Sequence, residues 1–215
     1  MNKKDIVTWA KQIKYNLRRF FMITHYQNIH PKSRVGLNDL VKNPNNLYLD
    51  ELSTLKRDDV IMNARARFIM KKWSGSAEEL MVITGNHMSI VGKNVKEVTN
   101  KVKDIEDTHN EYDKDVIVDE DVWIGARVTV LQGVHIGRGC EIGAGTVLRS
   151  STPPYSIVIG NPAKVIGFRF TPEEIIEHEK ILYSEEERLP LELLQKNYKK
   201  YFLGRIKEIK KFIQL

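Results

Sequence analysis

The chain has 215 residues, the length of one domain with a small extension, and its 41% hydrophobic and 29% charged residues exclude global disorder. No apolar run approaches the roughly 18 residues of a membrane span, and the N-terminus does not have the pattern of a secretory signal. The single cysteine, Cys140, excludes an intramolecular disulfide framework and a cysteine-rich zinc module, so we expect a cytoplasmic protein.

The net charge of +6 is concentrated at the two ends of the chain. Residues 1–34 carry eight Lys/Arg and one acid, residues 196–215 carry seven and one, and the middle keeps 19 basic and 26 acidic residues. A nucleic-acid groove more often interleaves basic and aromatic residues along one module. We therefore predict no nucleic-acid partner.

The N-terminal segment, residues 1–27, carries a helical pattern. Between residues 5 and 22, apolar side chains recur at three- and four-residue spacing with basic side chains elsewhere. This spacing predicts an amphipathic basic helix. Such a helix packs on the body or on another subunit, or it makes a peripheral contact with an anionic membrane surface.

The middle of the chain is a repeat with a period of six. A helix would spread such positions around its circumference and a hairpin sheet would show a period of two, whereas a triangular β-solenoid needs this spacing. Each hexad then forms one short strand and one corner, and the repeating aliphatic residue points inward. The repeating residues are Val118, Ile124, Val130, Ile136, Ile142 and Leu148. Cys140 stands at another inward position and is predicted to be a buried structural thiol.

The pattern is looser before this segment and is interrupted once. Residues 28–79 resemble degenerate earlier coils, and residues 88–117 form a charged insertion. An insertion of this length in a compact fold is usually functional. The prediction is an all-β solenoid domain over residues 28–170 with an extruded loop at 88–117.

The last segment, residues 171–215, is predicted to be a helical extension. Thr171 supplies an N-cap, and Pro172 follows it with two acids in the first turn. We expect helices over 173–183 and from about 191 to 212, the second broken near Gly204.

Several motifs between residues 80 and 170 resemble the hexapeptide-repeat acyltransferases, and most closely the branch that O-acetylates sugars of bacterial surface polysaccharides. The resemblance implies a left-handed parallel β-helix and a homotrimer with sites between neighbouring subunits. It also implies transfer of an acetyl group from acetyl-CoA to a hydroxyl of a small-molecule or lipid-linked sugar. The motifs are Val122-Trp123-Ile124-Gly125-Ala126, Gly133-Val134-His135-Ile136-Gly137, Ile142-Gly143-Ala144-Gly145-Thr146-Val147 and Gly160-Asn161-Pro162-Ala163-Lys164-Val165-Ile166.

The resemblance also implies roles for single residues. His87, directly before the insertion, matches the family's general base, and an imidazole suits the removal of a proton from a poorly nucleophilic hydroxyl. The positions that match coenzyme contacts are Trp123, Gly125, Ala126, Ala144, Arg149, Ser150 and Lys164. The candidate contacts to the acceptor are Asn63, Asn86 and His109, the last as part of a lid.

Other functions remain open at this point. An antibiotic acetyltransferase of the streptogramin or chloramphenicol type, or a sugar-nucleotide acetyltransferase, would carry the same motifs, and a non-catalytic scaffold would use the same solenoid. A metal-dependent hydratase similar to gamma-class carbonic anhydrases needs three histidines, two of them only a few residues apart. His87 and His109 are 22 positions apart and have no close partner, so we predict no metal.

Overall fold

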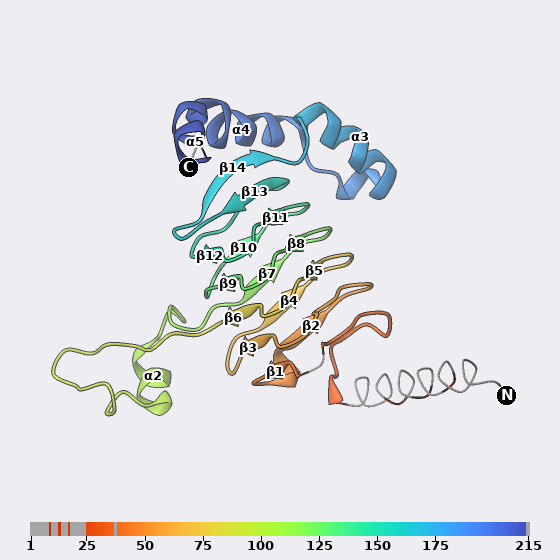
Figure 1. The fold of residues 1–215 in the computed structure, drawn as a ribbon. Coiled ribbons are helices and arrows are strands. Elements are labelled where there is room, and N and C mark those ends of the chain that lie inside the picture. Colours follow the sequence, from red (N-terminus) through yellow and green to blue (C-terminus); the bar gives the residue numbers. More distant parts are fainter. Residues whose placement is uncertain (1–8, 10–12, 14–16, 18–24, 37, 214–215) are drawn as a thin grey trace.

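A triangular prism of three sheets forms the body of the molecule (Figure 1). The computed structural model describes residues 9, 13, 17, 25–36 and 38–213. The helix predicted over residues 5–22 therefore lies, apart from three isolated positions, outside the described residues.

The chain visits the three faces of the prism in a fixed order, and the strands within each face are parallel except for β14 at the end of the third face. The first face contains β1 (Leu40–Val41), β3 (Val60–Met62), β6 (Met81–Ile83), β9 (Thr129–Val130) and β12 (Val147–Leu148). The second face contains β2 (Leu47–Leu49), β4 (Phe68–Met70), β7 (Val116–Val118) and β10 (His135–Ile136). The third face contains β5 (Gly75–Ser76), β8 (Trp123–Ile124), β11 (Glu141–Ile142), β13 (Ser156–Ile159) and β14 (Lys164–Phe168). The antiparallel β13–β14 hairpin closes the solenoid.

The strand register gives the length of each coil. Along the first face, the paired residues Leu40, Val60, Met81, Thr129 and Val147 are separated by 20, 21, 48 and 18 residues. The 48-residue step contains the predicted insertion, and the strands on either side of it still pair in register. The insertion therefore leaves the prism without interrupting it.

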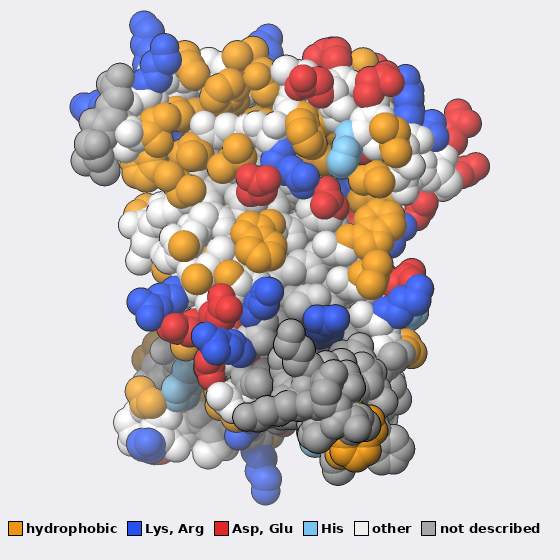
Figure 2. All heavy atoms as spheres, turned by 45° about the vertical axis from the view of Figure 1, so that its right-hand side comes forward, with side chains coloured by type: hydrophobic (Ala, Val, Ile, Leu, Met, Phe, Trp, Pro, Cys, Tyr) orange, Lys and Arg blue, Asp and Glu red, His pale blue; other side chains and the backbone are white. Residues whose placement is uncertain are grey.

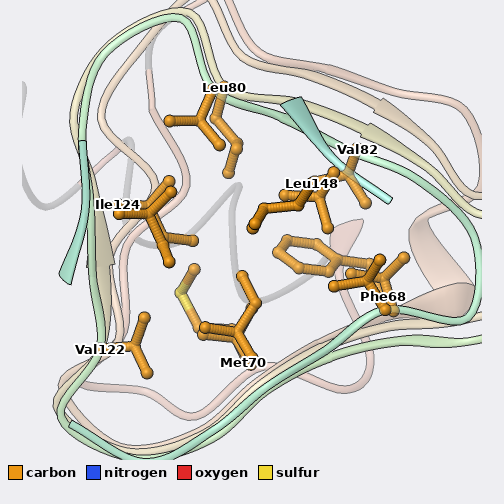
Figure 3. Packing of buried hydrophobic residues seen from close by; sticks show 14 of the residues in the cluster. Phe68, Met70, Leu80, Val82, Val122, Ile124 and Leu148 are labelled. Atoms are coloured by element: carbon orange, nitrogen blue, oxygen red, sulfur yellow. The ribbon is translucent and has the colours of Figure 1, made fainter. Parts of the chain in front are cut away.

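The repeating aliphatic residues point into the prism, as predicted. All six, from Val118 to Leu148, have relative exposures of 0–1%. Figure 3 shows side chains from all three faces meeting in the middle, including Phe68, Val82 and Ile124. Burial of each such side chain contributes roughly 1.5–3 kcal/mol. The Cys140 thiol is also buried, and burial raises its pKa.

The insertion projects from the side of the prism as a loop (Figure 1). It carries α2 (Asn100–Glu106), whose N-terminus is capped by the Thr99 side chain. The chain rejoins the prism at Val116, the first residue of β7. The fold thus presents one large loop on an otherwise regular body.

Three helices cover the end of the prism beyond the last coil (Figure 1). They are α3 (Pro172–Leu182), α4 (Leu191–Tyr201) and α5 (Ile206–Ile213), with the 3-10 turns η2 (Glu185–Glu187) and η3 (Leu203–Arg205) between them; a further 3-10 turn, η1 (Pro44–Asn46), lies in the body. The Thr171 N-cap, which the structure completes as a capping box with Glu174, and the break near Gly204 are both as predicted.

A buried carboxylate connects these helices to the last coils through hydrogen bonds and an ion pair. Glu179 of α3 is fully buried, and it accepts hydrogen bonds from the Tyr155 hydroxyl at 3.1 Å and the Leu189 N–H at 2.5 Å. Arg138 of the prism lies 3.3 Å from the same carboxylate. Because a buried charge needs partners of this kind, the contacts fix the position of the helices above the prism.

Charged side chains are unevenly distributed over the end of the molecule that the C-terminal helices cover. Figure 2 shows basic side chains projecting from one side of this end and acidic side chains gathered on the other. The first turn of α3 carries Glu173 and Glu174, whereas the last turns of α4 and α5 carry lysines. None of the helices in the described part of the chain combines the length and apolar character that a membrane crossing requires.

Candidate active site

One corner of the prism, between the first and second faces, carries both Arg149 and the start of the loop that contains His87. Continuing the register of β6, β9 and β12 by one residue aligns Ile83, Leu131 and Arg149. Adjacent parallel strands are about 4.8 Å apart, so Ile83 and Arg149 are separated by roughly 10 Å along the prism. The insertion leaves the body at this corner, which we call the loop corner.

His87 lies on the loop where it leaves this corner. Its side chain is exposed, and its Nε2 lies 2.9 Å from the carbonyl oxygen of Val95 in the same loop. A carbonyl only accepts hydrogen bonds, so this contact requires a proton on Nε2 and, in the neutral ring, leaves the lone pair on Nδ1. The backbone N–H of His87 donates to the Asn86 side chain at 2.8 Å. Contacts within the loop thus orient the imidazole.

A nearly buried lysine closes the base of the loop. The Lys103 ammonium group of α2 donates to the carbonyl oxygen of Asn86 at 2.9 Å and pairs with Asp113 at 2.8 Å. Arg65 of the prism pairs with the same Asp113 carboxylate, also at 2.8 Å. Loss of a partner from such a nearly buried pair is costly, so these contacts hold the residue next to His87 against the body.

Three of the predicted coenzyme residues line a single cleft. The cleft has a volume of about 530 Å³ and lies between the last coil and the C-terminal helices. Arg149 and Ser150 enter it from the loop corner, and Lys164 enters it from the start of β14. Within the described part of the chain, the Arg149 side chain has no ion-pair partner.

The other four predicted coenzyme residues lie together on a different part of the prism. Trp123 is on the third face and is 49% exposed, with Gly75 and Glu141 as its strand neighbours. A Cβ atom on Gly125 would lie 2.6 Å from the backbone nitrogen of Ala144, so only glycine fits there. Ala126 lies at the same corner, and its carbonyl oxygen accepts a hydrogen bond from Gly145. Within one chain, the seven residues therefore form two groups.

The candidate acceptor residues occupy different environments. Asn63 is fully buried, and its side-chain amide both donates to and accepts from the backbone of Asn43, at 2.8 and 2.9 Å. These bonds occupy the amide inside the coil, so we do not propose Asn63 as a contact to an acceptor. Asn86 is exposed beside His87. His109 is exposed on the loop, with its Nδ1 at 3.1 Å from the Thr108 hydroxyl.

The C-terminal extension contributes two residues to the cleft that were not predicted. Tyr201 ends α4 and Arg205 ends η3, and both line the cleft opposite the last coil. The helix break at Gly204 was visible in the sequence, but the packing of this break against the last coil was not. Among the described residues, no group of three or more His, Cys, Asp or Glu side chains is arranged to hold a metal ion.

Comparisons of the sequence point to acetyltransferases. Residues 115–150 match the family of bacterial transferase hexapeptide (six repeats). A probable macrolide acetyltransferase of Lysinibacillus sphaericus is 37% identical over 109 residues, which cover 51% of this chain and 56% of that protein. A chloramphenicol acetyltransferase of Klebsiella aerogenes is 48% identical over 59 residues, or 27% of this chain and 28% of that protein. The chain thus spans about half or less of the length of these relatives.

Comparisons of the structure point to the same solenoid. A maltose O-acetyltransferase from Clostridium difficile 630 has a TM-score of 0.59 at 21% identity, over 70% of this chain and 74% of that chain. A hexapeptide-repeat acetyltransferase from Vibrio cholerae, complexed with acetyl coenzyme A, has a TM-score of 0.58 at 20% identity, over 72% and 77%. At these identities the likeness establishes the fold alone. Together the matches confirm the resemblance that the motifs predict, and the chain carries the repeat of the hexapeptide-repeat acetyltransferases.

Proposed function

We propose that this protein is an acetyltransferase that moves an acetyl group from acetyl-CoA to a hydroxyl group of a sugar. The proposal rests on two features of the loop corner: the loop that carries His87 leaves it after Ile83, and the cationic cleft begins at Arg149, about two coils from Ile83. A base and an anion-binding cleft on one corner suit a long substrate with its reactive thioester at one end and its phosphates at the other.

His87 is the proposed general base. Its Nε2–H is held by the Val95 carbonyl oxygen, so the Nδ1 lone pair is available for the proton of the acceptor hydroxyl. As Nδ1 takes this proton, the acceptor oxygen forms a bond to the thioester carbonyl carbon. The carbon–sulfur bond then breaks, and the departing thiolate takes the proton from the imidazolium ring. General base catalysis of this kind contributes roughly 10²–10⁴ in rate.

The coenzyme would contact residues from two subunits of a homotrimer. The two groups of predicted coenzyme residues lie on different parts of one prism, and a site between neighbouring left-handed β-helices would bring them together. Exposed apolar side chains on the first face, Leu40, Met62 and Met81, provide a surface of the kind that subunit contacts bury. Trp123 would then form a wall of the site.

The acceptor class has two candidates. A sugar in cell-surface polysaccharide biosynthesis is our first proposal, in the cytoplasm or at the inner face of the membrane, where the basic N-terminal segment would contact anionic lipid. An antibiotic hydroxyl is the second, and it is favoured by the names of the macrolide and chloramphenicol acetyltransferases to which the chain is similar. Both acceptors require the same chemistry at His87.

The test is a comparison of three forms of the full chain, wild type, His87→Ala and His30→Ala, in release of CoA from acetyl-CoA with a panel of sugars, nucleotide sugars and antibiotics. We expect His87→Ala to lower kcat by at least about 10²-fold with the best acceptor. His30 lies in the first described turns of the prism and accepts a hydrogen bond from the Lys32 N–H, so His30→Ala is the matched control and should retain activity. Near-wild-type turnover in His87→Ala would contradict the assigned base, and release with antibiotics alone would select the second acceptor.

A further inference from the structure

The C-terminal helices supply one wall of the cleft beside the last coil. Tyr201 and Arg205 reach it from α4 and η3, whereas Arg149 and Lys164 reach it from the solenoid. The sequence repeat that identifies the family covers residues 115–150 and does not include the helices. This wall is therefore a feature of the extension.

A single carboxylate neutralises two of the three cations that line the cleft. Glu208 accepts two hydrogen bonds from the Arg205 guanidinium group, at 3.0 and 2.9 Å, in a side-by-side arrangement. The Lys164 ammonium group lies 3.6 Å from the same carboxylate. The hydrogen bonds from Arg205 hold the pKa of Glu208 below its ordinary value, so the carboxylate is charged at neutral pH.

Phosphate is the ligand chemistry that matches this arrangement. A guanidinium group binds a phosphate through the same two parallel hydrogen bonds that it gives a carboxylate. Arg149 provides a third positive charge in the cleft and, among the described residues, has no ion-pair partner. A phosphate group that entered the cleft would meet cations already arranged around a carboxylate.

The family resemblance already implies that Arg149 and Lys164 contact the phosphates of CoA; we propose that Arg205 of the C-terminal extension binds these phosphates beside them and that Glu208 competes with the phosphates. The inference rests on the proposed function, because it takes acetyl-CoA as the donor. Glu208 stabilises the positions of Arg205 and Lys164 while the cleft is empty. The same carboxylate weakens phosphate binding, because it competes for the same cations and repels the like charge of the phosphate.

The proposal predicts opposite effects for two substitutions that break the same ion pair. Arg205→Gln removes a cation from the cleft and should weaken CoA binding by about tenfold. Glu208→Gln removes the competing carboxylate and should tighten CoA binding by about threefold to fivefold. If the Arg205–Glu208 pair only held the helices in place, its loss from either side would change CoA binding in the same direction.

The experiment measures dissociation constants by titration calorimetry of the full chain with CoA and, separately, with uridine diphosphate. Glu177→Gln and Lys180→Gln are matched controls, because they break a comparable exposed ion pair of 2.7 Å on α3 outside the cleft, and they should stay within twofold of wild type. Uridine diphosphate tests whether the cleft serves the phosphates of a sugar-nucleotide acceptor instead.

Two results would overturn the inference while the proposed function stands. In one, both substitutions weaken CoA binding or neither changes it, although His87-dependent acetyl transfer persists. In the other, the two substitutions change the affinity for uridine diphosphate and leave that for CoA unchanged. A wild-type chain that binds no CoA would contradict the inference and the proposed function together. Thermal unfolding of each variant establishes that it is folded when it is titrated.

Discussion

The earlier coils of the prism, residues 28–85, and the later coils, residues 116–159, build the same three faces in different ways. The later strands pair at steps of 18 residues, three hexads, except for a step of 16 between β11 and β13, whereas the earlier ones pair at 20 or 21. The corners differ as well. The left-handed corner residues of the earlier coils are Asn38, Leu52, Asp58, Trp73 and Glu79, and those of the later coils are Asp121, Arg127, Gly133, Gly139, Gly145 and Tyr155.

The two regions share one property of the sequence that determines this fold. The interior is equally well excluded from solvent in both regions, with Leu47 and Phe68 at 0% exposure beside Ile124 and Ile136 at 0%. Additional residues are accommodated at the corners and in the extruded loop, while the strands remain in register. The inward columns of apolar side chains, more than the exact period of six, therefore hold the prism together.

The largest expected change in stability comes from a pair of core substitutions, one in each region. Phe68→Ala in the earlier coils should lower the free energy of unfolding by about 3–5 kcal/mol, and Ile136→Ala in the later coils by about 2–5 kcal/mol. Both side chains are fully buried in one continuous core. Urea unfolding followed by circular dichroism measures both values. A cost below about 1 kcal/mol for Phe68→Ala alone would mean that the earlier coils contribute little to the common core.

A buried carboxyl group distinguishes the earlier coils from the later ones. The strand hydrogen bonds place Asp59 in one column with Leu80, Val128 and Thr146. The Asp59 carboxyl group accepts a hydrogen bond from the Leu80 N–H at 2.8 Å and lies 3.2 Å from the Ser76 hydroxyl. Burial raises its pKa to about 7, against 3.8 for an exposed aspartate. The earlier coils thus contain a group whose ionisation opposes folding.

The raised pKa of Asp59 predicts a pH-dependent penalty. Between about pH 4 and pH 7 the folded chain keeps the proton and the unfolded chain releases it, so this group lowers stability as pH rises and adds no further change above pH 7. Asp59→Asn removes the titration. Its stability relative to wild type should therefore increase by roughly 3–4 kcal/mol from pH 4 to pH 8.

Urea unfolding of wild type and Asp59→Asn at pH 4, 6 and 8 measures this difference directly. Asp50→Asn is the control, because Asp50 is an exposed aspartate of the same region. A constant difference between Asp59→Asn and wild type across this range would contradict the assigned pKa.

The sequence predicted the later coils and the C-terminal helices because their signals are local. A period of six, an N-cap and a helix break can each be read within a few residues. The earlier coils carried a weaker signal, since none of their left-handed corner residues is glycine and the coils exceed 18 residues. Arg205 could not be predicted, because packing between the helices and the last coil brings it into the cleft. The burial of Asn63 could not be predicted either, because its hydrogen-bond partner Asn43 lies 20 residues away on the preceding coil.

The smallest expected changes in stability come from substitutions at the left-handed corners. They place a glycine at a corner of the earlier coils and an alanine at a corner of the later coils. Leu52 is 51% exposed and has a φ of 59°, a left-handed conformation that costs a leucine about 1–2 kcal/mol. Glycine adopts this conformation freely but loses more entropy on folding, so Leu52→Gly should stabilise the chain by about 0.5–1 kcal/mol. Gly145→Ala, at a φ of 70° with open space around the added carbon, should destabilise it by about 1 kcal/mol. Thermal unfolding should show midpoint shifts of about 2–4 °C per kcal/mol, opposite in sign. Leu52→Ala keeps the strain and should give no gain, so a lower midpoint for Leu52→Gly than for Leu52→Ala would show that the earlier corners are not strained.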